Sequence, residues 1–219
     1  MPDSTIDADI EIPQQNPAGP PHLLVLLHGA ASRPSQLAAL AIGWQSRLQS
    51  ARAWLPAAPL TDAAGGRHWT PPDHYPVSAD EVRAAAATLA HRLRVEQDRL
   101  GIAAARTIVI GFSQGASMAL ELAFEAPAVS ALIIAYAARL YRLPRPGDRC
   151  VARIHLQHGA LDSVLPVGHA EAAARRLRAI GADVHLQIQP DDGHLIGQLQ
   201  INDGTRALMN WRFGRASLS

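Results

Sequence analysis

The chain has 219 residues, of which 48 % are hydrophobic and 18 % are charged. Such a length and composition are typical of one domain with a buried core, and we expect residues 1–219 to form a single domain. The 20 basic residues are all arginine and nearly cancel the 19 acidic ones. Because the arginines form no basic block, we expect no nucleic-acid partner.

Neither a signal peptide nor a membrane span is predicted. The first twelve residues are acidic and lack a basic stretch followed by an apolar one. No apolar run approaches the roughly 20 residues that cross a bilayer. The only cysteine, Cys150, excludes an internal disulfide and is typical of a reducing compartment. We therefore expect a cytoplasmic protein, and the sequence leaves open whether it is a monomer or a homodimer.

The N-terminal third alternates short apolar runs with polar connections. Within residues 1–21, apolar and acidic side chains alternate over residues 6–12, which predicts an edge strand, and a Pro- and Gly-rich lead-in follows. Residues 23–27 are all apolar, as in a strand covered on both faces of a parallel sheet. The next predicted elements are a helix at 35–49, a strand at 53–57 and a long connection at 59–77, a length usually associated with function or disorder.

The rest of the chain alternates helices and strands. Ser78 and Glu81 form a capping box, which predicts the start of a helix that Gly101 ends. Strands are predicted at residues 107–112, 131–136, 154–157 and 184–188. Helices are predicted from Gln114 to just before Pro127, at 167–180 and at 204–212. This alternation predicts an α/β fold in which helices cover both faces of a mostly parallel sheet.

A glycine-flanked serine joins the strand at 107–112 to the helix that follows it. The segment reads Gly111-Phe112-Ser113-Gln114-Gly115. A serine in a strained turn projects its hydroxyl, and only glycine fits on either side of so tight a turn. The pattern predicts Ser113 as a nucleophile, and the alternative is a structural turn serine.

Other predicted strands also end in reactive residues. Because ligands of open α/β sheets bind at the carboxyl ends of the strands, these residues should share one edge with Ser113. His194 is the candidate base for the serine hydroxyl, and Asp162 would fix the tautomer of its imidazole ring. The order Ser, Asp, His is the one that the α/β-hydrolase fold uses. The N–H groups of Gln114 and Ala30 are the candidate oxyanion donors.

Further histidines and aspartates compete for these roles. His28 and His158 each precede a glycine at a strand end, and we interpret both as structural hydrogen-bonding residues. Asp148 lies before a strand and therefore at the opposite edge, while Asp191 and Asp192 are expected to cap a turn. No His, Cys, Asp or Glu cluster has metal-ligand spacing and no Gly-rich phosphate loop follows a strand, so we predict no metal and no cofactor.

These motifs resemble those of the phospholipase/carboxylesterase family of α/β-hydrolases, which is also described as acyl-protein thioesterase-like. The resemblance covers roughly residues 22–212 and is nearest to the small bacterial carboxylesterase branch. It rests on five motifs: Leu26-Leu27-His28-Gly29, Gly66-Arg67-His68-Trp69, Ile110-Gly111-Phe112-Ser113-Gln114-Gly115, His158-Gly159-x-x-Asp162-x-Val164-x-Pro166 and Gly193-His194.

The resemblance implies cofactor-free hydrolysis of carboxylic esters or thioesters of short to medium acyl chains through an acyl-enzyme on Ser113. It also implies an oxyanion hole formed by Ala30 and Gln114, and a substrate pocket lined by Trp69 and Val164. For Trp69, the alternative is a core residue that anchors the long connection. No connection is long enough for an inserted cap domain, so an open, shallow site is expected.

Residues 28–32 depart from the family pattern. The family usually has His-Gly-large apolar-Gly-Asp, whereas this chain has His28-Gly29-Ala30-Ala31-Ser32. The sequence therefore leaves the conformation of this loop open.

Two other functions also remain open: a binding protein on a hydrolase fold, and a hydrolase of peptides or lactones with the same three residues. The sequence does not determine the acyl length, the leaving group, or whether the substrate is a small metabolite or an acylated protein.

Overall fold

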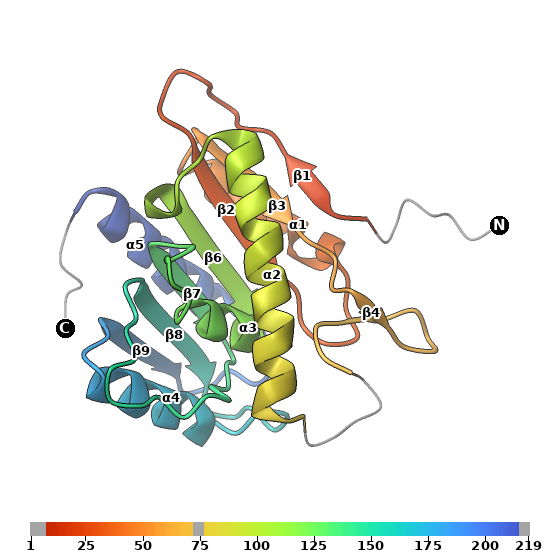
Figure 1. Ribbon diagram of the computed structural model, residues 1–219, viewed down its shortest axis with the longest axis vertical. Helices are drawn as coiled ribbons and strands as arrows, with labels where there is room; N and C mark the ends of the chain where they lie inside the picture. The colour runs from red at the N-terminus through yellow and green to blue at the C-terminus, as the bar shows by residue number, and fades with distance from the viewer. Residues whose placement is uncertain (1–7, 72–76, 215–219) are drawn as a thin grey trace.

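The structure, a computed structural model, describes residues 8–71 and 77–214 (Figure 1). Seven strands form one sheet in the order β1-β3-β2-β6-β7-β8-β9. Strand β1 is antiparallel to β3, and every other neighbouring pair is parallel. The strands are β1 (Ile10–Ile12), β2 (His22–Leu27), β3 (Ala51–Leu55), β6 (Thr107–Phe112), β7 (Leu132–Tyr136), β8 (Arg153–Gly159) and β9 (Val184–Gln189).

Helices cover both faces of this sheet, which confirms the predicted architecture (Figure 1). One face packs against α2 (Ala79–Leu100), α3 (Gln114–Leu122) and α4 (Gly168–Ala179). The other face packs against α1 (Ala38–Gln45) and α5 (Gln198–Arg212). Short 3-10 turns, Pro34–Leu37 and Ala104–Arg106, precede α1 and β6. None of the helices in the described part of the chain combines the length and the apolarity needed to cross a membrane.

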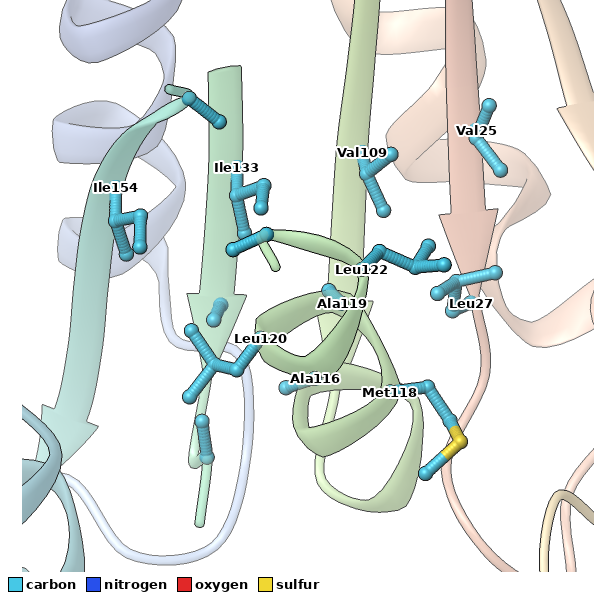
Figure 2. Packing of buried hydrophobic residues seen from close by; sticks show 14 of the residues in the cluster. Val25, Leu27, Val109, Ala116, Met118, Ala119, Leu120, Leu122, Ile133 and Ile154 are labelled. Carbon is cyan, nitrogen blue, oxygen red and sulfur yellow. The ribbon is translucent and has the colours of Figure 1, made fainter. Parts of the chain in front are cut away.

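The core explains why the central strands are continuous apolar runs. Successive side chains of a strand point to opposite faces of the sheet. In β2, Val25 and Leu27 face α2 and α3, while Leu24 and Leu26 face the α1 and α5 side. Figure 2 shows the first of these two layers, where Met118 and Leu122 of α3 lie beside the end of β2. The side chains on both faces of β2 are therefore buried, as the sequence predicts.

Several boundaries differ from the prediction. Strand β3 begins at Ala51 and β8 extends to Gly159, whereas α1 ends at Gln45. Helix α5 begins at Gln198, six positions before the predicted start at Gly204. A β-carbon at Gly204 would collide with the Tyr136 hydroxyl and would crowd Trp44 at 3.0 Å. This glycine therefore lies inside the helix because the sheet approaches it closely, rather than marking the helix start.

The long connection contains a small hairpin that the sequence did not predict. Strands β4 (Leu60–Thr61) and β5 (Arg67–His68) pair antiparallel. Between them, the Asp62 carboxylate accepts hydrogen bonds from the N–H of Gly66 at 2.8 Å and of Ala64 at 2.9 Å. The remainder of the predicted connection, residues 72–76, lies outside the described residues, as does the start of the predicted edge strand at residues 6 and 7.

Helix α2 begins and ends where the sequence predicts. The Ser78 hydroxyl accepts from the Glu81 N–H, and the Glu81 carboxylate accepts in return from the Ser78 N–H. At the other end, Gly101 has a φ of 64°, the left-handed conformation that terminates helices and favours glycine.

Candidate active site

Ser113 lies on a strained turn between β6 and α3. Its φ is 53° and its ψ is −116°, a combination that residues with a β-carbon rarely adopt. The turn is held by two main-chain hydrogen bonds, from the Ser113 N–H to the Tyr136 oxygen at 2.9 Å and from the Ser117 N–H to the Ser113 oxygen at 3.0 Å. The strain is therefore imposed by β7 on one side and by the first turn of α3 on the other.

The two glycines of the motif are sterically required. A β-carbon at Gly111 would lie 2.5 Å from the Cα of Ala116. A β-carbon at Gly115 would collide with the main-chain oxygen of Leu27 and would lie 2.5 Å from that of His28. These contacts let α3 begin directly against the end of β2, and they confirm the steric reason given for the Gly-x-Ser-x-Gly spacing.

The structure brings Ser113, Asp162 and His194 together. The Nε2 atom of His194 lies 3.1 Å from the Ser113 Oγ, and its Nδ1 atom lies 2.7 Å from the Asp162 Oδ2. A carboxylate only accepts hydrogen bonds, so Nδ1 carries the proton and Nε2 presents a lone pair to the serine hydroxyl. The three residues follow three separate strands, β6, β8 and β9, which run parallel and end at one edge of the sheet.

Asp162 is held in its ionised form. Burial raises the pKa of this carboxyl, but hydrogen bonds from the Leu165 N–H, His194 and the Val164 N–H outweigh it, and the pKa lies below its ordinary value. Its Oδ1 accepts from the two N–H groups at 2.7 and 2.9 Å, which leaves Oδ2 for the histidine. Asp162 is therefore both charged and fixed in orientation at neutral pH.

The two competing histidines have structural roles, as predicted. The Nε2 atom of His28 accepts from the Ala58 N–H at 3.1 Å, so its Nδ1 carries a proton and donates to the Gly29 oxygen at 2.8 Å. Burial is the main cause that lowers the pKa of His28. The Nε2 atom of His158 donates to the Leu165 oxygen at 2.8 Å, and the ring is fully buried.

The competing aspartates also lie apart from the base. The Asp148 carboxylate accepts from the Arg145 N–H at 2.8 Å, in the loop that precedes β8. The Asp192 carboxylate accepts from the Gln200 amide of α5 at 2.9 Å, so it holds the turn against that helix. Asp191 is exposed. The sequence-based choice of Asp162 is the one that the geometry favours.

Ala30 and Gln114, the predicted oxyanion donors, both line a cleft beside Ser113. The side chain of Gln114 is turned away to hold the long connection: its oxygen accepts from the Trp69 N–H at 2.7 Å, and its amide donates to the Thr70 hydroxyl at 2.8 Å. The main-chain N–H of Gln114 stands at the N-terminus of α3, where the helix dipole favours negative charge.

The loop that departs from the family pattern contains one residue in the left-handed backbone conformation. Ala31 has a φ of 52°, although it is not glycine. The hairpin holds it there, because the Arg67 N–H donates to the Ser32 oxygen at 3.0 Å and a β-carbon at Gly66 would lie 2.8 Å from the Cα of Ala31. The close approach of Gly66 thus fixes a conformation that the sequence of the loop left open.

The cleft has a volume of about 270 Å³. Apolar and polar side chains share its walls, and Val164 lies among them as predicted. Its lining consists of Ala30, His68, Pro71, Val77, Ser113, Gln114, Ser117, Arg139, Tyr141, Val164 and Leu165. Among residues 8–71 and 77–214, no group of three or more His, Cys, Asp or Glu residues is arranged to hold a metal ion.

Trp69 does not line this cleft, although it borders a neighbouring cavity together with Pro71, so its predicted place in the substrate pocket stays a prediction. The side chain is 3 % exposed, and its indole N–H donates to the His28 oxygen at 2.8 Å. It belongs to the core on the α2 side of the sheet. The polar end of an indole needs a partner when it is buried, and the partner here is the main chain at the end of β2. These contacts favour the alternative of a core anchor for Trp69.

Sequence reasoning missed seven residues of the described cleft wall. Three are apolar, Pro71, Val77 and Leu165, and four are polar, His68, Ser117, Arg139 and Tyr141. His68 donates to the Asp62 carboxylate at 2.8 Å across the unpredicted hairpin. Arg139 and Tyr141 follow directly after the predicted strand at 131–136. The rule that strand ends share one edge could have found both, because it applies to every parallel strand of the sheet.

Comparison with known proteins identifies a family. The model of the family described as Phospholipase/Carboxylesterase matches residues 8–209. Esterase YpfH of Escherichia coli (strain K12) is 39 % identical over 109 residues, which are 50 % of this chain and 47 % of that protein. The chain thus matches about half the length of this relative.

Two solved structures resemble the chain over nearly its whole length. The crystal structure of esterase PE8 has a TM-score of 0.82 and 29 % identity, and the match covers 93 % of this chain and 98 % of that one. A Bacillus cereus carboxylesterase has a TM-score of 0.80 and 14 % identity, and the match covers 95 % of this chain and 96 % of that one. At that identity, the second likeness is one of fold alone.

Proposed function

The chain belongs to the phospholipase/carboxylesterase family and has the α/β-hydrolase fold, and from this membership we propose that it is a serine hydrolase of carboxylic esters. The observation that carries the proposal is the hydrogen-bonded series Ser113, His194 and Asp162 beside the cleft. A serine with a base and an acid in this arrangement is the standard apparatus of acyl transfer.

In the first half of the reaction, the Ser113 oxygen attacks the ester carbonyl while His194 Nε2 takes the hydroxyl proton. Asp162 stabilises the imidazolium that forms, and its orientation by two N–H donors keeps the ring aimed at Ser113. His194 then gives the proton to the departing alcohol. The acyl group is left esterified to Ser113.

In the second half, His194 removes a proton from water, and the resulting hydroxide attacks the acyl-enzyme. The proton returns to Ser113 as the carboxylic acid leaves. In both halves the tetrahedral oxyanion accepts hydrogen bonds from the main-chain N–H groups of Ala30 and Gln114, which both line the cleft. Losing one such donor typically costs on the order of 10²–10³ in rate.

We propose substrates with short to medium acyl chains, and either alcohols or thiols as leaving groups. The cleft volume of about 270 Å³ and the apolar contribution of Val77, Val164 and Leu165 support an acyl group of this size. The thiol alternative uses the same proton transfers. A cytoplasmic location is proposed as well, supported by the single cysteine.

A fluorophosphonate probe tests the nucleophile. We expect the probe to label the wild type and Ser130→Ala, a control at a buried serine outside the cleft, but not Ser113→Ala. Hydrolysis of 4-nitrophenyl butyrate should fall by about 10⁴-fold or more in Ser113→Ala, since the nucleophile is lost. Unchanged hydrolysis or labelling in the folded Ser113→Ala variant would contradict the proposal.

The acyl length is tested by a panel of 4-nitrophenyl esters from acetate to palmitate beside acyl thioesters. We expect kcat/KM to fall sharply once the acyl chain exceeds the length that the cleft accommodates. Saturable binding of the esters without any turnover would instead indicate a binding protein on this fold.

A further inference from the structure

Arg139 enters the same cleft as Ser113 from the opposite side to the oxyanion loop. In the sheet, β6 lies between β2 and β7; Ala30 follows β2, Ser113 follows β6 and Arg139 follows β7. The main chain after β7 turns sharply, since Ala137 has a φ of 53°, and the Arg139 N–H donates to the Ser117 hydroxyl at 3.2 Å. Arg139 is therefore attached to the first turn of the nucleophile's own helix.

The guanidinium group of Arg139 is oriented by an aromatic ring rather than by an anion. Its Cζ lies 4.7 Å from the centre of the Tyr141 ring, which also lines the cleft. The side chain is half-buried. Among residues 8–71 and 77–214, no carboxylate pairs with it, although eight other ion pairs of arginine are present there.

Arg142, three positions later, has the opposite environment. Its Nε donates to the buried Glu121 carboxylate at 3.1 Å, and its Cζ lies 4.4 Å from the centre of the Phe124 ring. Both arginines therefore stack on an aromatic ring, but only Arg142 has a counter-ion within the described residues. The fold supplies a carboxylate to one guanidinium and leaves the other facing the cleft.

The described lining of the cleft contains no acidic side chain. The histidine of the lining, His68, is hydrogen-bonded to Asp62. Burial, and after it the positive charge of Arg139, lower the pKa of His169, and a histidine cannot supply the negative charge that would compensate Arg139. A half-buried guanidinium group has lost part of its hydration, and hydrogen bonds to a bound anion replace those that it has lost to water.

We infer that Arg139 binds a carboxylate carried by the substrate, so that the protein prefers carboxylate-bearing esters to neutral esters of the same length. This inference rests on the proposed ester hydrolysis. A planar guanidinium offers paired N–H donors that match the two oxygens of a carboxylate. The carboxylate can belong to the acyl group or to the leaving group, and the two sources are separable by experiment.

Two matched substrate pairs provide the test. Monoethyl adipate and ethyl hexanoate differ only in a carboxylate or a methyl group at the far end of the acyl chain. 4-Acetoxybutanoate and butyl acetate differ in the same way at the end of the leaving group. Hydrolysis is followed by acid release at constant pH, and the measured quantity is the ratio of kcat/KM between the two members of each pair.

In the wild type, we expect kcat/KM for the anionic member to exceed that for the neutral member by about tenfold in one of the pairs. This ratio is what one hydrogen-bonding contact between charged groups contributes. In Arg139→Gln this ratio should fall to near one, and Arg139→Lys should keep part of it. Arg145→Gln, a matched control on the same loop that does not line the cleft, should keep the wild-type ratio. Raising the ionic strength should lower the wild-type ratio.

Ratios near one in both pairs for the wild type, or equal ratios in the wild type and Arg139→Gln, would overturn the inference while ester hydrolysis itself stands. Absence of hydrolysis of all four esters, together with absence of fluorophosphonate labelling at Ser113, would overturn the proposed function, and the inference with it.

Discussion

The two sides of Ser113 are built differently. On one side, which we call the oxyanion side (residues 28–32 and 66–70), hydrogen bonds between uncharged groups connect the two segments to each other and to Gln114. Trp69 donates to the His28 oxygen, Gln114 bonds both Trp69 and Thr70, and Ser32 pairs with the hairpin. On the other, the arginine side (residues 137–141), one main-chain hydrogen bond and one ring contact hold Arg139.

This difference agrees with the roles proposed for the two sides. A donor to a developing oxyanion must already stand within hydrogen-bonding distance of it, so small displacements cost rate. A charge that selects among substrates acts over a longer distance and tolerates some movement of its side chain. The oxyanion side should therefore be sensitive to small steric changes, whereas the arginine side should be sensitive to loss of charge and little else.

Among the variants that compare the two sides of Ser113, Gly66→Ala on the oxyanion side should have the largest effect. The new β-carbon would lie 2.8 Å from the Cα of Ala31 and 2.7 Å from the Asp62 carboxylate, so the hairpin and the Ala30 loop must move apart. We expect kcat for 4-nitrophenyl butyrate to fall by on the order of 10²-fold, the scale of a misplaced oxyanion donor.

The control is Gly43→Ala in α1, where no atom lies within 4 Å of the added β-carbon. That variant should keep its activity and gain up to about 1 kcal/mol in the free energy of unfolding, because alanine is favoured over glycine inside a helix. Full activity in Gly66→Ala would show that the Ala30 loop is not fixed by the hairpin.

A smaller effect is expected from Gln114→Ala, which keeps the main-chain N–H but removes the side chain that bridges to Trp69 and Thr70. The buried N–H of Trp69 loses its acceptor, so unfolding should become easier by about 1–3 kcal/mol. We expect kcat to fall by roughly tenfold as the connection loosens. Denaturant unfolding measures the change in stability, and steady-state kinetics measures the change in kcat. If neither quantity decreases, the side-chain bridge of Gln114 is dispensable.

The smallest effect on stability is expected from Arg139→Gln. The main-chain hydrogen bond to Ser117 remains, and the ring contact with Tyr141 contributes about 0.5–1 kcal/mol at a partly exposed site. The free energy of unfolding should therefore change by less than about 1 kcal/mol, less than in Gln114→Ala. An equal loss of stability in the two variants would mean that both sides of Ser113 are equally structural.

The sequence predicted those parts of the site that depend on local sterics and on strand direction. Gly111 indicates the turn because the contact that requires glycine there, with Ala116, lies within a few residues in the sequence. Asp162 and His194 were chosen because parallel strands end at one edge, which holds whatever the details of packing. The helices on both faces of the mostly parallel sheet agree with the alternation of strands and helices in the sequence.

The parts that the sequence did not predict depend on contacts between distant segments. Trp69 could have faced the cleft or the core, and the hydrogen bond to His28, 41 positions away, places it in the core. The start of α5 was misplaced because Gly204 is required by Tyr136 and Trp44, which lie in other elements. Likewise, nothing local distinguishes Arg139 from Arg142 until Glu121 is seen to pair with only one of them.

The base of the proposed site follows β9, an edge strand of the sheet. Strand β9 pairs with β8 alone, and residues 184–188 are only half-buried, whereas β6, which carries Ser113, is covered on both faces. Local opening starts where the fewest apolar contacts must be broken. Transient detachment of this edge would withdraw His194 from Ser113 while the central strands stay folded, so the catalytically competent population can shrink well below the temperature at which the protein as a whole melts.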